Sequence, residues 1–188
     1  MGFRLILALV FALLAPTLAF GASWRLDPET SVAVDVGWQG GSVEVQFPSI
    51  SGTIEFDEGH PETAKARISV AAAAARTGVG VVDALVRGPE FLDAERYPAI
   101  VFELDRLAQT SASTAEIVGR ITMRDVTRPV TFAAKVYRYG PAKDDPDRFE
   151  AGFDLTGTID RTQFGSTGGL PGVAAVLPVR IRLAMTSQ

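Results

Sequence analysis

Apolar side chains alternate with polar or small ones through most of this chain. In residues 32–38, for example, Val32, Val34, Val36 and Trp38 are each separated by alanine, aspartate or glycine. A side-chain period of two places such a set on one face of a β-strand. The same alternation recurs in residues 43–47, 54–56, 68–72, 100–104, 117–123, 130–136, 149–159 and 179–185. The pattern predicts about nine strands, with the apolar face of each pointing inward.

Turn-forming residues separate the alternating segments, for example Gly40-Gly41, Pro48-Ser49 and Gly168-Gly169. Short strands at regular spacing are typical of a sandwich or a barrel. The connections are too short for repeated crossover helices, so the sheet is predicted to be antiparallel. The chain is therefore expected to be an all-β domain.

One segment breaks the alternation. Between residues 79 and 95, Val82, Leu85 and Val86 have helical spacing. Pro89 is expected to end this helix and could start a second one through Phe91 and Leu92. A helical insert of this size in an all-β chain closes one end of a barrel or covers an open sheet edge.

The amino terminus has the order of residues found in a secretory signal peptide. A short positive start over residues 1–4 precedes an apolar run, residues 5–14, and then small residues at cleavage spacing. The run is shorter than the roughly 20 residues that span a bilayer. We expect residues 1–21 to be a cleaved signal peptide, with its exact site open, and residues 22–188 to form one exported domain in the periplasm.

Composition excludes several classes of function. The net charge is −4, without the basic stripe that nucleic-acid binding requires, so no nucleic-acid partner is expected. The chain contains no cysteine, which excludes thiolate metal sites. A domain of this size can bury enough core to need no disulfide.

Signals for catalysis are weak. The only histidine, His60, lies between Gly59 and Pro61 in an expected turn. No serine occupies a nucleophile elbow, and the carboxylates near the helical insert are typical of solvated helix charges. We expect no enzyme, no catalytic residue, no metal site and no cofactor other than a bound lipid.

Phenylalanines recur on nearly every predicted strand, and alanine or glycine alternates with many of them. Barrels of about eight strands have interiors that side chains can just fill, or that hold one small ligand. The residues alone leave both a filled core and an internal channel open.

Four motifs follow one another along the chain. The first is a strand, turn and strand over residues 43–57 that contains Gly52, Ile54, Phe56 and Asp57. The second runs from Thr77 through Asp83 and Arg87 to the stretch FLDAERYPAIVF, residues 91–102. The third is GRITMRDVTRPV, residues 119–130, and the fourth is IDRTQFG, residues 159–165. In this order they resemble the YceI family of bacterial periplasmic lipid-binding proteins.

The resemblance implies an antiparallel lipocalin-like β-barrel of about eight or nine strands with a short helical insert. It implies a long apolar ligand, such as a polyisoprenoid, a quinone-type lipid or a fatty amphiphile. It also implies a homodimer and, in some members, partnership with a membrane b-type cytochrome. The chain departs from the family in lacking its histidines, since Leu85 stands at the insert position, and in having Asp125 where the third motif has glycine.

These observations lead to a set of candidate ligand-binding residues. Arg87 and Arg161 are expected at the polar mouth of the barrel, where each either meets a head group or forms an ion pair with Asp83 or Asp160 respectively. The expected apolar lining consists of Val34, Val36, Trp38, Phe56, Leu85, Phe91, Phe102, Ile121, Phe132, Phe153 and Phe164.

The leading hypothesis is a periplasmic carrier that holds a long apolar ligand inside the barrel. The alternative is a non-enzymatic accessory or interaction module with a filled core, for example one that partners a membrane b-type cytochrome. The alternative requires that no continuous internal channel exists.

Overall fold

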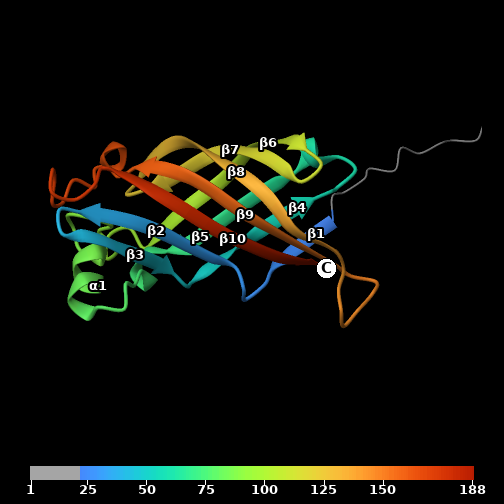
Figure 1. Ribbon diagram of the computed structural model, residues 1–188, viewed down its shortest axis with the longest axis horizontal. Helices are drawn as coiled ribbons and strands as arrows, with labels where there is room; N and C mark the ends of the chain where they lie inside the picture. The colour runs from blue at the N-terminus through green and yellow to red at the C-terminus, as the bar shows by residue number, and fades with distance from the viewer. Residues whose placement is uncertain (1–21) are drawn as a thin grey trace, which may run out of the picture.

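The computed structural model describes residues 22–188 and forms one elongated antiparallel barrel (Figure 1). The predicted signal peptide lies outside the described residues. The strands are β1 (Ala22–Leu26), β2 (Ser31–Trp38), β3 (Gly41–Phe47), β4 (Ile50–Phe56), β5 (Lys65–Ala71), β6 (Ala99–Ser111), β7 (Thr114–Met123), β8 (Val126–Pro141), β9 (Phe149–Asp160) and β10 (Val176–Ser187). One α-helix, α1 (Gly80–Arg87), lies between β5 and β6, and 3₁₀ turns occur at Pro61–Thr63, Ala72–Ala74 and Arg161–Phe164.

The ten strands occupy eight positions around the barrel. Strand β10 pairs along one edge with β9, and along its other edge first with β2 and then with β1. Strands β1 and β2 therefore lie end to end, and their neighbours β4 and β3 do the same. The pairing of β1 with both β4 and β10 closes the sheet on itself. The predicted lipocalin-like, antiparallel barrel is confirmed.

Proline accounts for both interruptions. Pro28 lies between β1 and β2, where the Thr30 amide donates to the Asp27 carbonyl at 2.9 Å. Pro48 lies between β3 and β4. Because proline has no N–H, it cannot donate to a sheet ladder.

The helical insert covers the place where the sheet is incomplete. Strand β3 reaches the β5 side of the barrel only through an isolated bridge between Gln46 and Arg76. Helix α1 follows directly and turns Val86 toward the cluster of Val45, Phe47 and Ala75. The predicted helix is confirmed, but the second helix after Pro89 is wrong, because residues 89–97 form successive turns with Asp93 at a positive φ of 49°.

A two-residue turn joins β7 to β8. Met123 pairs with Val126, and the two residues between them, Arg124 and Asp125, both have positive φ, at 52° and 58°. Such a backbone has the type I′ twist that suits a tight hairpin. The Arg124 side chain donates from Nη1 to the carbonyls of Pro89 and Phe91, at 2.7 and 2.8 Å, which ties this turn to the helical insert.

The barrel has two different ends. At one end lie α1, the β2–β3 turn and the long connection between β9 and β10 (Figure 1). At the other lie β1, the carboxyl terminus and the β8–β9 loop (Figure 1). We call the first the helix end and the second the terminal end.

Candidate functional site

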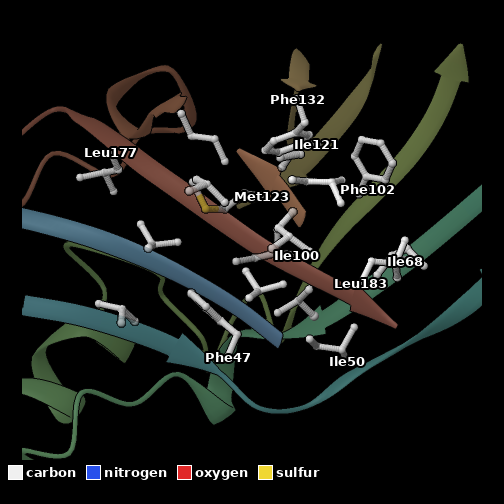
Figure 2. Close-up of a pocket in the computed structure, with 18 of the residues that line it drawn as sticks. Phe47, Ile50, Ile68, Ile100, Phe102, Ile121, Met123, Phe132, Leu177 and Leu183 are labelled. Atoms are coloured by element: carbon white, nitrogen blue, oxygen red, sulfur yellow. The ribbon is translucent and has the colours of Figure 1, made fainter. Parts of the chain in front are cut away.

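The barrel encloses a cavity of about 560 Å³. Small-molecule sites occupy about 300–1,000 Å³, so this space has the size of a binding site. All ten strands and α1 contribute to its wall. Figure 2 shows the side chains converging, with Phe102, Ile121 and Phe132 on one side and Phe47 and Ile50 on another.

The cavity wall is almost entirely apolar. Only four lining residues carry polar side chains, namely Thr30, Lys65, Arg161 and Ser166. The Lys65 ammonium reaches outward to Glu55 at 3.5 Å, so only its aliphatic stem can line the cavity. The Thr30 hydroxyl donates to the carbonyl of Ala184 at 2.8 Å. Besides the indole N–H of Trp38, the polar groups left for a ligand are those of Arg161 and Ser166.

Glycines in the strands make room for the aromatic rings. A Cβ on Gly119 would lie 2.5 Å from the Phe102 ring, and one on Gly157 would lie 2.6 Å from the Phe132 ring. These two phenylalanines contact each other edge to face, with centroids 6.2 Å apart. The large and small residues thus interdigitate within the wall and still leave the central space open.

The cavity opens at the helix end. Trp38, Val79 and Leu85 line it and are also 45%, 51% and 55% exposed. Trp38 ends β2 and forms a bridge with Val173 of the β9–β10 connection. The mouth is therefore bounded by the β2–β3 turn, α1 and this connection.

Ten of the eleven predicted apolar residues lie on the cavity wall, and Phe164 does not. Phe164 is buried in the core, where it joins a cluster with Met123, Phe132 and Val179. It lies at the end of the 3₁₀ turn Arg161–Phe164, whose conformation the strand alternation could not indicate. The ten on the wall are Val34, Val36, Trp38, Phe56, Leu85, Phe91, Phe102, Ile121, Phe132 and Phe153.

Arg161 lines the cavity but is only 3% exposed. Its guanidinium donates to four backbone carbonyls of the β9–β10 connection, those of Ala174 (2.8 Å), Ser166 (2.8 Å), Gly168 (2.8 Å) and Val173 (3.1 Å). Burial lowers the pKa of Arg161, and the nearby Asp160 carboxylate acts in the opposite direction. Arg161 therefore folds this connection over the mouth.

Arg87 is not part of the cavity wall. Its Nε donates to the Asp83 carbonyl at 3.0 Å, and its Nη1 donates to the Ala73 carbonyl at 3.3 Å. The placement at the polar mouth is wrong for Arg87, because the residue points back along the insert.

The expected ion pairs of Asp83 and Asp160 are also wrong. The Asp83 carboxylate accepts from the Thr77 amide at 2.5 Å and from the Thr77 hydroxyl at 2.7 Å. Asp160 accepts in the same way from Thr162, at 3.0 and 2.6 Å. The pKa of each carboxyl group is lowered. The main cause is the hydrogen bond from the threonine hydroxyl, followed by the one from the threonine amide. Both carboxylates fix local turns.

Sequence reasoning missed Val79 and Ser166. Val79 precedes α1 but continues its helical spacing, since it lies three residues before Val82 and seven before Val86, whereas Ser166 lies in the connection that Arg161 folds. Extending the helical period by one step toward the amino terminus finds Val79, but no periodic pattern indicates Ser166. By contrast Leu177, which also lines the cavity, continues the alternation of Val179 and Ile181 by one step.

Among residues 22–188, no group of three or more histidine, cysteine or acidic side chains could hold a metal ion. His60 is exposed, with Nδ1 3.4 Å from the Glu62 carboxylate. Within the same residues, no helix is both long enough and apolar enough to cross a membrane.

Several solved structures share this fold. BcnA of Burkholderia cenocepacia superposes with a TM-score of 0.73 at 20% identity, over 87% of this chain and 99% of that one. A YCEI protein of Campylobacter jejuni gives 0.64 at 22% identity, over 76% and 84%. A polyisoprenoid binding domain from Saccharophagus degradans gives 0.67 at 12% identity, over 89% and 99%.

Sequence relatives reach higher identity. A UPF0312 protein of Pseudomonas putida GB-1 is 32% identical over 174 residues, which cover 90% of this chain and 88% of that protein. One from Pseudomonas syringae pv. tomato is 31% identical over 169 residues, covering 88% and 87%. The sequence model of the YceI-like domain matches residues 24–186. The chain belongs to the YceI-like family.

Proposed function

We propose that this protein is a periplasmic carrier that holds one long apolar chain inside its barrel. The ligand class is a polyisoprenoid, a quinone-type lipid or a fatty amphiphile. The observation that carries the proposal is the cavity wall, in which only four of the lining residues have polar side chains. Family membership and the polyisoprenoid binding domain with the same fold support it.

Burial alone accounts for binding of this kind. Each methylene removed from water contributes about 0.8 kcal/mol, so a chain of about 16 methylenes gains about 13 kcal/mol. Association costs about 4–15 kcal/mol in lost freedom. Short chains therefore fail to bind and long ones are retained without any specific polar contact.

The polar end of the ligand belongs at the helix end. Arg161 and Ser166 are the polar residues of the cavity wall on the β9–β10 connection, beside the mouth. Four of the five N–H donors of Arg161 already bond to carbonyls, so the Ser166 hydroxyl is the better contact for a carbonyl or hydroxyl head group. The apolar chain then extends toward the terminal end.

The accessory module with a filled core is not supported, because the interior contains the 560 Å³ cavity. A homodimer and a membrane b-type cytochrome as partner stay predictions that follow from the family resemblance.

Uptake of fluorescent fatty probes of increasing length tests the proposal. Affinity should rise about fourfold for each added methylene until the cavity is filled. Ile100→Trp should abolish uptake, because Ile100 lines the cavity. Its neighbour Val101 is not on the cavity wall, so Val101→Trp is the matched control and should bind normally. Equal uptake by the two variants, or affinity independent of chain length, would contradict the proposal.

A further inference from the structure

Exposed apolar side chains gather at the helix end of the barrel. Within residues 22–188, eight large apolar side chains are exposed. Only Tyr139, near the end of β8, and Phe149, at the start of β9, lie beside the β8–β9 loop of the terminal end. We call the other six the mouth rim: Trp38, Val79, Val81, Leu85, Leu170 and Val176. Val81, 78% exposed, and Leu85 are four residues apart on α1, so they share one outward face.

The segments that carry most of the mouth rim contain no charge. Residues 36–43, 77–82 and 162–179 include no aspartate, glutamate, lysine, arginine or histidine, although 21% of the chain is charged. Asp83, which follows the second segment, uses its carboxylate on Thr77. At the terminal end, by contrast, residues 143–148 contain five charged side chains.

The mouth rim is continuous with the cavity. Trp38, Val79 and Leu85 belong to both the rim and the cavity wall. An apolar chain that leaves the cavity at this point meets the apolar side chains of these three residues. A tryptophan at such a boundary suits a membrane interface, because indole combines a large apolar body with one polar N–H.

We propose that the mouth rim docks on an electrically neutral lipid bilayer, so that the ligand passes between membrane and cavity without crossing water. This inference rests on the proposed function, and it identifies a lipid bilayer as the partner with which the carrier exchanges its ligand. Neutral lipid fits because residues 36–43, 77–82 and 162–179 offer no lysine or arginine to anionic head groups, and the chain carries a net charge of −4. Arg87 of α1 uses its guanidinium on the carbonyls of Asp83 and Ala73. A second copy seated here would block the mouth. Strand β1, with which the described residues begin, lies at the terminal end and therefore does not cover the rim (Figure 1).

Binding of the purified protein to phosphatidylcholine vesicles tests the docking. The protein should co-sediment with the vesicles, and its tryptophan emission should shift to shorter wavelength as Trp38 enters the interface. Trp24 is 6% exposed and contributes a constant background. Val81→Lys should weaken vesicle binding at least tenfold. Because Val81 is not on the cavity wall, the same variant should take up a fatty probe from aqueous solution normally.

Phe149→Lys is the matched control, because Phe149 is exposed at the start of β9, beside the β8–β9 loop of the terminal end. It should leave vesicle binding unchanged. Three results would overturn the docking while leaving the carrier function intact: no vesicle binding by a protein that takes up the probe, binding only to phosphatidylglycerol vesicles, or a dimer that Val81→Lys dissociates. Failure of the unsubstituted protein to take up any probe would instead overturn the carrier function.

Discussion

The guanidinium carbon of Arg161 lies over the ring of Phe91, 5.4 Å from its centroid. Arg161 begins the connection from β9 to β10, and Phe91 belongs to the helical insert between β5 and β6. Their contact joins two of the three segments around the mouth. A cation–π contact of this kind contributes about 0.5–2 kcal/mol, with the larger values where water is excluded.

Arg161→Lys should destabilise the protein by about 3 kcal/mol. Lysine keeps the charge but cannot place donors on four carbonyls at once, so buried carbonyls would lose their partners. Urea unfolding measures the loss. Arg128→Lys is the control, because Arg128 is exposed, and its stability should change by no more than about 0.5 kcal/mol. Equal midpoints for the two variants would show that the carbonyl contacts do not hold the connection.

Gly119→Ala should lower both stability and probe uptake. The added Cβ would lie 2.4 Å from the Glu103 carbonyl oxygen and 2.5 Å from the Phe102 ring. Relieving this overlap moves the strand or pushes the ring into the cavity, at a cost of about 1–3 kcal/mol. Gly140→Ala is the control, since its Cβ meets nothing within 4 Å. Unchanged uptake together with reduced stability would mean that the Phe102 ring moves away from the cavity and not into it.

Asp125→Gly should stabilise the protein by about 0.5–1 kcal/mol. Asp125 has a φ of 58°, a left-handed backbone that glycine adopts without the steric cost of a Cβ. Thermal unfolding should show a higher midpoint. Asp125→Ala keeps the Cβ and should give no gain. A gain of the same size from alanine would point to the removal of the charge instead.

Acid should weaken the Asp83–Thr77 link in a defined direction. The Thr77 hydroxyl, and then its amide, holds the pKa of Asp83 below its ordinary value of 3.8. The resulting stabilisation is fully present above that value and is lost as the pH falls through the lower pKa of the folded state. The difference in thermal midpoint between the unsubstituted protein and Asp83→Asn should therefore shrink in strong acid. A difference that grows as the pH falls would contradict this sign.

Much of the fold could be predicted because the interior of a barrel imposes a period of two. Val34 and Phe102 line the cavity because each belongs to an alternating run whose apolar face must be buried. Strand β1 (Ala22–Leu26) was missed although Trp24 and Leu26 alternate with Ser23 and Arg25, because it directly follows the segment predicted to be a signal peptide. The β8 strand extends past the prediction to Pro141, through a register shift between Val136 and Arg138 that breaks the alternation.

The polar residues of the site could not be assigned in the same way. Spacing places Arg161 next to Asp160, and an ion pair between them is the simplest expectation. In the structure, the guanidinium instead donates to four backbone carbonyls of the β9–β10 connection, those of Ser166, Gly168, Val173 and Ala174. That arrangement depends on how a loop rich in glycine folds, which no periodic pattern encodes.

Native mass spectrometry of the protein, purified without detergent from a bacterial host that exports it, tests the central claim most directly. We expect the intact chain with one additional discrete mass, released on denaturation and identified as a molecule with a long apolar chain. Ile100→Trp should carry no such mass, and Val101→Trp should carry it normally. A bare chain that also fails to take up fatty or polyprenyl probes would contradict the claim that the cavity holds a lipid.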